Sequence, residues 1–521
     1  MSSQNQWPKP RARTFGAEFE LLVAWLYEGE PDPHQGSEEN LPPILRLKVD
    51  DDIRRQYDGS QSKLPKEIEV MLYDEISKLF KDHYLPARIY TRCLSQDDFK
   101  FWVLKEDSTI QTKRKDYKWF RVEIVSPAER ASPEAFKTIR YALELLSSNH
   151  RVTSNSSCGF HVHVGDGTEL MPLEHIKRVV GLLWAADPLL GTLHPPYRRV
   201  NFYSQSIRER SHLAHGDVPE DMGLWLHDAD KDCCIRYIGR GTRFGEQSTS
   251  WRRNNNTERL KRAFDATREP GNFKPFWDPP KEGENEDEDA LELSVHDIRI
   301  DLLGPEGPTE TYDREGIEAR IAKHETSVDK GNAALDVPDS SIWNRRTQRF
   351  AHPRFIPEAE ELDKDPRATP KAAKDFGVFP GVSAIFRAPS SCVVSWLHIA
   401  EESMVRPNYN ITPYNCINIQ NPDSRPGTIE FREAEGTASA EWAEMWARIC
   451  VGVTHFAIHA PVVDYMAVID HIGKAASKRA AYDIVDLLNE IGLFAEAAFT
   501  EERLIQNKER FRLKFISEAE A

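Results

Sequence analysis

The stretch FGAEFELLVAWLY, residues 15–27, alternates like a β-strand and carries two acidic side chains in an otherwise apolar sequence. Successive residues of a strand point to opposite faces, so Glu18 and Glu20 share one face with Gly16. Burying a carboxylate is costly unless it is paired or binds a metal ion. A half-exposed sheet with one water-covered face is the simpler interpretation, although Leu22 continues the glutamate face with an apolar side chain.

Four further segments repeat this alternation of apolar and polar residues. They are FRVEIVS (residues 120–126), CGFHVHVG (158–165), CINIQ (416–420) and TIEFREA (428–434). Five strands of this kind predict a sheet whose apolar face packs on helices. The opposite face would be rich in Glu, His, Asn and Arg, which makes it a candidate active-site floor.

The composition is that of a globular protein with a sizeable core, since 40% of the 521 residues are hydrophobic and 29% are charged. The net charge of −16 argues against general binding to nucleic acids or anionic membranes. No segment approaches the ~20 apolar residues that cross a bilayer, and the first residues lack the apolar core of a signal peptide. Seven cysteines without a CxxC pair favour reduced thiols. We therefore expect a cytoplasmic protein with neither nucleic-acid nor membrane partners.

The chain divides into four zones by composition. Residues 13–205 and 376–465 contain the predicted strands and are expected to form the two halves of one catalytic domain. Residues 206–375 carry prolines, polar tracts and an acidic run, which predict a loop-rich and partly disordered insertion. Residues 466–521 predict C-terminal helices. Strand pairs mixed with helices make α+β the expected fold class.

Capping signals and helical spacing place several helices. Ser132 is a suitable N-cap and Pro133 suits the first helical position. Apolar residues then recur at helical spacing. Further helices are expected over residues 173–187, 438–459, 473–493 and 494–507.

The predicted polar face has the groups for phosphate chemistry. Several carboxylates together favour a hard divalent cation such as Mg²⁺ or Mn²⁺. An arginine among them can bind a phosphate or carboxylate through its planar guanidinium. With a histidine added, these groups suit phosphoryl transfer from ATP. The sequence has no Walker A motif, and GRGTRFG, residues 239–245, lacks the strand-to-helix setting of a phosphate loop.

Four motifs in this order resemble the amidoligase family, part of the carboxylate–amine ligase superfamily with glutamate–cysteine ligase and glutamine synthetase. They are FGAEFE, WVLKEDSTI followed by VEIVSP, CGFHVHVG and TIEFREAEGT, and the resemblance covers residues 13–205 and 377–460. It implies a glutamine-synthetase-like curved antiparallel sheet, with helices on the convex face and ATP with Mg²⁺ or Mn²⁺ on the concave face.

The resemblance also implies a reaction and its substrates. A small-molecule or peptide carboxylate would take the γ-phosphate of ATP to form an acyl phosphate. An amine would then displace phosphate and form an amide or peptide bond.

Roles for single residues follow from the matching motif positions. Arg432 would face the phosphates, and His163 would lie near metal and phosphate as a catalytic residue. Asp107 stands in EDSTI, where the family has an aspartate–glycine–serine turn but this sequence lacks the glycine. The implied metal ligands are Glu18, Glu20, Glu123 and Glu430. Further candidates for substrate or nucleotide contacts are His161 (with a structural role as its alternative), Asp107, Arg199, Asn201, Tyr203 and Asn418.

Three other interpretations stay open. His161 and His163 could belong to a zinc hydrolase, but that site needs a third protein ligand and the polar faces are dominated by Glu. Cys158 could be a nucleophile, although most cysteines are small buried hydrophobes. The scaffold could also be a non-catalytic interaction module. A second histidine pair, in HFAIH at residues 455–459, lacks the Glu of an HExxH motif, and we expect it to have a helix-packing role.

Overall fold

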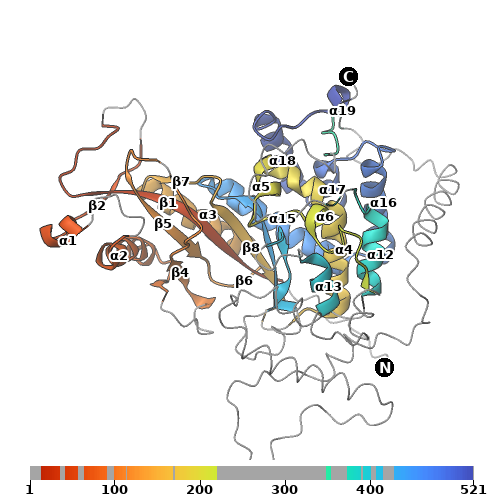
Figure 1. Ribbon diagram of the computed structural model, residues 1–521, viewed down its shortest axis with the longest axis horizontal. Coiled ribbons are helices and arrows are strands. Elements are labelled where there is room, and N and C mark those ends of the chain that lie inside the picture. Colours follow the sequence, from red (N-terminus) through yellow and green to blue (C-terminus); the bar gives the residue numbers. More distant parts are fainter. Residues whose placement is uncertain are drawn as a thin grey trace, which may run out of the picture. The chain divides into compact units, whose positions relative to one another are not determined.

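A computed structural model describes most of the chain (Figure 1). The described residues are 13–35, 41–56, 64–90, 99–112, 114–167, 170–219, 346, 348–353, 372, 374–388, 391–399, 406–414 and 427–519. The segment CINIQ with Asn418, and most of the predicted insertion, lie outside them. The chain forms two compact units, which we describe one at a time. The first comprises Met1–Thr168 with Glu430–Gly452, and the second comprises Glu169–Ile429 with Val453–Ala521.

The first unit is built on an open, mostly antiparallel sheet with helices, which confirms the α+β class. Its strands follow the order β3-β4-β5-β1-β8-β10, and three short strands, β2, β6 and β7, also pair with β1. The strands are β1 (Thr14–Tyr27), β2 (Leu45–Leu47), β3 (Ala87–Ile89), β4 (Trp102–Lys105), β5 (Lys118–Val125), β6 (Glu129–Arg130), β7 (Val152–Thr153), β8 (Gly159–Gly165) and β10 (Thr428–Glu435). The helices are α1 (Asp51–Gln56), α2 (Lys66–Asp82) and α3 (Pro133–Asn149), and α15 (Ala440–His459) begins in this unit.

The register of the central strand β1 decides which side chains meet. Its antiparallel neighbours are β5 and β8, and directly opposed residues share a face. Glu20 lies opposite Glu123 of β5, and Glu18 lies opposite His161 of β8. The predicted alternation is therefore confirmed for these strands, and their polar residues fall on one face of the sheet.

The other face of the sheet packs against helices and supplies the core of this unit. Phe19 stacks on Phe160 of β8, with ring centroids 4.9 Å apart. Trp102 of β4 meets Phe80 of α2 edge to face, and Phe15 of β1 stacks on a phenylalanine of α3. Fully burying a side chain such as Phe contributes ~1.5–3 kcal/mol relative to leaving it exposed. This packing holds β1 in place and so fixes the positions of its two glutamates.

The polar face does not remain polar along its whole length. Beyond Glu20, Leu22 packs with Ile110 and Cys158, and Trp119 lies against this cluster. The apolar residues that continue the glutamate face are thus covered by a second, smaller core. Cys158 is fully buried in it, which gives this cysteine a packing role.

Helix α3 begins where its capping signals predict. The Ser132 hydroxyl accepts a hydrogen bond from the Ala135 amide at 3.1 Å, and Pro133 occupies the first turn. An N-cap of this kind contributes about 1 kcal/mol. The predicted start of the helix after residue 132 is confirmed.

The second unit is largely helical. Its elements are α4 (Leu173–Leu190), η2 (Gly191–Leu193), α5 (Pro196–Val200), α6 (Ile207–Arg210), α12 (Val378–Arg387), α13 (Ser391–His398), β9 (Tyr409–Asn410), η6 (Thr412–Tyr414), α16 (Val462–Ala476), α17 (Ile484–Glu490), α18 (Phe494–Gln506) and α19 (Ile516–Ala519). The predicted helices over 173–187 and 494–507 are confirmed as α4 and α18, and 438–459 as α15. Among the described residues, no helix combines the length and apolar character needed to span a bilayer.

The expected helix over residues 473–493 is wrong. Helix α16 ends at Ala476, and Lys478 has a φ of 58°, a left-handed conformation that cannot continue a right-handed helix. Asp483 then starts α17, because its carboxylate accepts hydrogen bonds from two amides of the first turn. The apolar periodicity runs through both helices and conceals the break between them.

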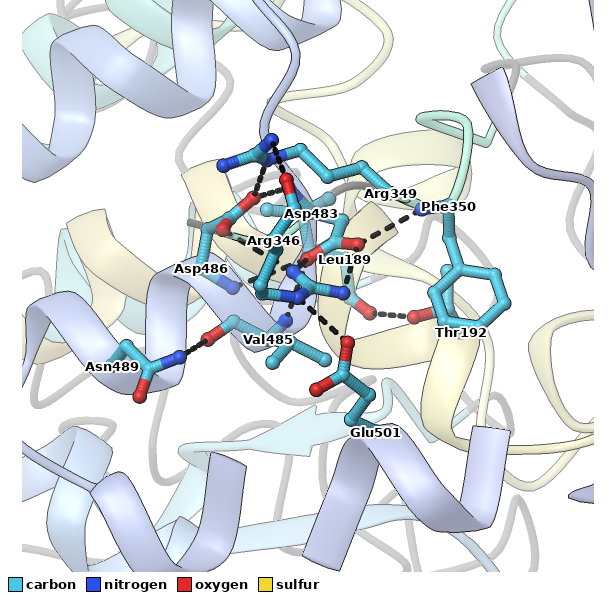
Figure 2. A network of polar contacts seen from close by, with 10 residues as sticks. All are labelled: Leu189, Thr192, Arg346, Arg349, Phe350, Asp483, Val485, Asp486, Asn489 and Glu501. Atoms are coloured by element: carbon cyan, nitrogen blue, oxygen red, sulfur yellow. Dashed lines mark hydrogen bonds and ion pairs between the residues drawn. The ribbon is translucent and has the colours of Figure 1, made fainter. Parts of the chain in front are cut away.

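A buried charge network surrounds Arg346 in the second unit (Figure 2). The Arg346 guanidinium donates to both carboxylate oxygens of Asp483, at 2.6 and 3.0 Å, and to Glu501 at 2.8 Å. Arg349 donates to Asp486 at 2.8 Å. Burial and the Asp483 charge together raise the pKa of Asp486 to about 6. The network holds Arg346, Arg349 and Phe350 against the start of α17.

Candidate active site on the polar face of the sheet

Three side chains from three strands converge on the polar face of the first unit. Glu18 comes from β1, His163 from β8 and Glu430 from β10. His163 Nε2 lies 3.4 Å from Glu18 Oε1 and 3.9 Å from Glu430 Oε1. One ligand atom from each residue lies within 4.8 Å of those of the other two. These residues could therefore share one metal ion.

His161 occupies the deeper position on the same strand. It is 3% exposed, and its Nδ1 lies 3.3 Å from Glu18 Oε2 and 3.7 Å from Glu430 Oε1. Its Nε2 lies 3.7 Å from Glu20 Oε1. The buried His161 ring thus contacts three carboxylates. His163 is more accessible, because 24% of its side chain is exposed.

Arg432 completes the β10 contribution. Its guanidinium donates to the Glu430 carboxylate two residues before it on the same face. Only 4% of Arg432 is exposed, so the two charges compensate each other within the protein. The position of this guanidinium next to a carboxylate that could bind a metal ion suits the recognition of a phosphate.

A second group of charges lies on the β5 side. Glu123 forms an ion pair with Lys105 of β4, in which Lys105 Nζ lies 2.8 Å from Glu123 Oε1. Its cross-strand partner Glu20 accepts a hydrogen bond of 2.5 Å from the Gly159 amide. Both glutamates are largely buried, so a water-covered sheet face does not explain them.

The four carboxyl groups differ in their pKa values. Burial would raise the pKa of Glu430, but Arg432 and the two histidines hold it far below the usual range. Burial also opposes ionisation of Glu18, whose pKa is nevertheless held well below 4.5 by His163, Lys105 and hydrogen bonding to His161. Glu18 and Glu430 therefore remain ionised and able to bind a cation.

Glu20 and Glu123 behave in the opposite way. Burial raises the pKa of Glu20, against the effect of the neighbouring His161. Burial, followed by repulsion from the Glu18 charge, raises the pKa of Glu123 well above 4.5, and Lys105 offsets part of this. The ionised forms of Glu20 and Glu123 are therefore disfavoured in the folded protein.

The donor set fits a divalent cation. Metal–ligand bonds of ~2.0–2.2 Å place ligands on opposite sides of an ion about 4 Å apart. The atoms of Glu18, His163 and Glu430 are within reach of that spacing after small side-chain movements. Two carboxylates with one imidazole suit Mn²⁺ and Zn²⁺ as well as Mg²⁺. A cation would also offset the negative charge that Arg432 and Lys105 leave uncompensated.

Comparison with known families bears on the part of the chain that supplies β1, β5 and β8. Residues 11–219 match the family model described as "Putative amidoligase enzyme". Over these residues the chain is similar to the amidoligase family. The resemblance predicted from the motifs is thereby confirmed over these residues. Searches among curated proteins and among solved structures gave no match.

The amidoligase match includes most of the predicted site but not all of it. Glu430 and Arg432 lie beyond residue 219, and the structure brings them to the same face through β10. Asp107, within the match, lies in the turn after β4, where its carboxylate accepts a 2.6 Å hydrogen bond from the Thr109 amide. Burial is the main cause of the raised pKa of Glu20, and His161 lowers this pKa. The charge of Asp107 is close enough to raise it further.

The remaining predicted contacts belong to the second unit or are not described. Arg199 donates to Glu209 at 3.0 Å, and Asn201 accepts a hydrogen bond from the Tyr203 amide at 2.8 Å. Arg199, Asn201 and Tyr203 belong to the second unit, whereas the strand-face residues belong to the first. Asn418 lies outside the described residues.

Two positions of the site were missed from the sequence. Lys105 stands within the WVLK strand, but only the β4–β5 register of the structure places it opposite Glu123. Gly436 follows β10, and its amide donates to the Cys158 carbonyl at 2.8 Å. Gly436 packs against Cys158 and the Glu20 carbonyl, which come from distant parts of the sequence, so no local sequence pattern predicts this contact.

Replacing Gly436 by alanine is expected to damage the site through its position. A Cβ there would lie 2.5 Å from Cys158 Cβ and 2.9 Å from the Glu20 carbonyl, so β10 must shift. Overpacking of this kind costs about 1–3 kcal/mol of unfolding free energy. The matched control is Gly16→Ala, whose added Cβ has its nearest contact at 3.6 Å. Equal stabilities of the two variants in thermal unfolding would refute the close approach.

The raised carboxyl pKa values predict a pH effect on the metal-free protein. Protonation of Glu20 and Glu123 favours the folded state, so their contribution is full below their ordinary value of 4.5 and declines as pH rises through the raised values. Glu18 and Glu430 have lowered pKa values, and their contribution is lost only in acid.

We therefore expect the unfolding temperature to fall as the pH rises above about 5, because Glu20 and Glu123 then ionise in the unfolded chain more readily than in the folded protein. Glu123→Gln, which cannot ionise, should make this decline shallower, and so should a saturating divalent cation. Calorimetry across this range measures it, with Glu129→Gln as the exposed control. If the unfolding temperature falls with pH as steeply in Glu123→Gln as in wild type, the pKa of Glu123 is not raised in the folded protein.

Proposed function

We propose that this protein is an ATP-dependent carboxylate–amine ligase. The observation that carries the proposal is the convergence of Glu18, His163 and Glu430, with Arg432 beside them, on one face of a sheet. The family match of residues 11–219 supports a ligase-type enzyme that forms C–N bonds. The substrates would be ATP, a small-molecule or peptide carboxylate, and an amine.

We also propose that the sheet is related to that of glutamine synthetase. An open, mostly antiparallel sheet with helices on one face and side chains that could bind a metal ion on the other supports this relation. The polar face would be the concave, nucleotide-binding face.

Glu18, Glu430 and His163 would hold Mg²⁺ or Mn²⁺. When bound, the metal offsets charge on the phosphates of ATP and in the in-line transition state. His161 keeps the ligating carboxylates in position through its contacts with Glu18 and Glu430. Glu20 and Glu123 add further carboxylate oxygens on the β5 side.

The reaction would proceed in two steps on this face. The substrate carboxylate oxygen attacks the γ-phosphorus of ATP, the bond to ADP breaks, and an acyl phosphate forms. The amine then attacks the acyl carbon, phosphate leaves with the bonding electrons, and the amine loses a proton. Arg432 would stabilise the charge on the transferred phosphoryl group in both steps.

A trapping experiment tests the proposal. The protein is mixed with ATP, Mg²⁺ or Mn²⁺, pools of carboxylic acids, and hydroxylamine as a small nucleophilic amine. We expect hydroxamate formation and phosphate release that require both ATP and acid. Carboxylate labelled with ¹⁸O should pass label to the released phosphate. Absence of release with every pool, together with absence of nucleotide binding, would refute the ligase.

A zinc hydrolase is the second candidate. The structure supplies what the HVH strand alone lacked, because Glu18 and Glu430 join His163 in a three-residue set. Three protein ligands with an open position are the usual form of a catalytic zinc site. ATP dependence separates the two: hydrolysis of an amide or ester with Zn²⁺ and no nucleotide would favour the hydrolase.

A further inference from the structure

A second group of metal-ligating side chains lies in the second unit, outside the strand-face site. His455 and His459 stand four residues apart near the end of α15, so they lie on the same face of the helix. Their ring centroids are 4.5 Å apart. Both residues are exposed, so the HFAIH pair, for which a helix-packing role was expected, lies outside the buried core.

A third histidine approaches this pair from another helix. His175 lies in the first turn of α4, and its ring centroid is 6.4 Å from that of His459. The two helical segments are joined next to the cluster, because the Arg178 guanidinium donates to the carbonyl of Ala460. The Tyr465 hydroxyl also donates to the Arg178 carbonyl at 2.8 Å. These two hydrogen bonds from side chains to backbone carbonyls hold α4 close to the end of α15 and to α16.

We propose that His175, His455 and His459 form a binding site for an imidazole-preferring divalent ion, with Zn²⁺ as the expected occupant. Two histidines at i and i+4 on a helix can chelate one ion. Zn–N bonds of about 2.0–2.1 Å put two bound imidazole rings roughly 4.5–5.5 Å apart, and the His455–His459 spacing of 4.5 Å meets this. His175 completes the set after its half-exposed side chain turns toward the ion.

The chemistry of this site differs from that of the sheet face. Three neutral imidazoles select Zn²⁺, Ni²⁺ or Cu²⁺ over Mg²⁺, whereas carboxylate oxygens favour Mg²⁺ and Mn²⁺. An ion bound by residues of both α4 and α15 also links two helices, so binding should stabilise the folded protein. The two sites can be loaded separately by the choice of metal.

Zinc titration by calorimetry tests the site in the full-length chain. The background is Glu18→Gln with Glu430→Gln in excess Mg²⁺, which removes zinc binding at the sheet face. We expect one Zn²⁺ per chain, a higher unfolding temperature, and loss of binding as the imidazoles protonate below about pH 6. Nitrogen couplings in the Cu²⁺ spectrum should report two or three imidazoles.

The variants decide the outcome. His459→Asn should weaken Zn²⁺ by more than the 10–100-fold that loss of an outer-shell partner costs, and His175→Asn should weaken it by at least about tenfold. His83→Asn, at an exposed histidine of another helix terminus, is the matched control and should bind like the background. Unchanged zinc binding in both cluster variants, or none in the background protein, would overturn the proposal. Circular dichroism of the metal-free variants checks that each is folded.

Discussion

Replacing Glu430 by glutamine is expected to reduce phosphate release about 10²–10³-fold. The change keeps the size of the side chain but removes a ligand charge from the set with Glu18 and His163. It also leaves the Arg432 guanidinium buried without its carboxylate partner. The loss should therefore appear in metal affinity as well as in turnover. Mn²⁺ binding followed by electron paramagnetic resonance measures the affinity without any knowledge of the substrates.

Two further proteins sharpen this experiment. Arg432→Ala should lower release as strongly while retaining Mn²⁺ binding better than Glu430→Gln, because arginine would act on phosphate and not on the metal. Glu129→Gln, on the exposed strand β6 of the same sheet, is the matched control and should release phosphate like wild type. If Glu430→Gln and Arg432→Ala both keep wild-type activity, the polar face is not the catalytic site.

Replacing Arg346 by methionine is expected to lower the free energy of unfolding by about 3–5 kcal/mol. The substitution keeps an apolar stem but leaves Asp483 without its arginine and removes one of the two arginines beside Asp486, and both carboxylates are almost completely buried. Removing one partner of a buried ion pair is far more harmful than removing an exposed one, because the remaining charge stays desolvated. Calorimetric unfolding of the full chain should show the loss.

An exposed arginine gives the comparison for this variant. Arg55 pairs with Asp52 on α1, and both side chains are largely exposed, 75% and 88%. Arg55→Met should cost no more than ~1 kcal/mol. If both substitutions lower stability equally, the Arg346 network contributes no more than a surface pair.

Strand periodicity predicted much of the site, because side-chain direction in a strand depends only on residue parity. Glu18, His161 and Glu123 fall on the face that this parity assigns to them. Register between strands is a different matter. It depends on how segments pair in three dimensions, and so the Lys105–Glu123 ion pair did not follow from the sequence.

The misplaced helix over 473–493 has a similar origin. Apolar spacing continues across Lys478, whose left-handed backbone conformation no local preference of lysine predicts. Asp483 is the N-cap of α17, and an aspartate before an apolar-periodic segment is a sequence signal for the start of a helix. The three-histidine cluster was also beyond the sequence, since His175 and His459 come from separate helices.

The strand β10 gives the polar face its last two members from far along the chain. About 260 residues separate Gly165, at the end of β8, from Thr428, at the start of β10. The entropy of closing a chain grows only with the logarithm of its length, and doubling such a connection costs just ~0.6 kcal/mol. Loops between the helices of this intervening sequence can therefore lengthen or shorten during evolution with little penalty, provided that β10 still docks. A ribosome must also have synthesised all of this intervening sequence before Glu430 and Arg432 exist, so the complete set of charges cannot form when β1, β5 and β8 first emerge.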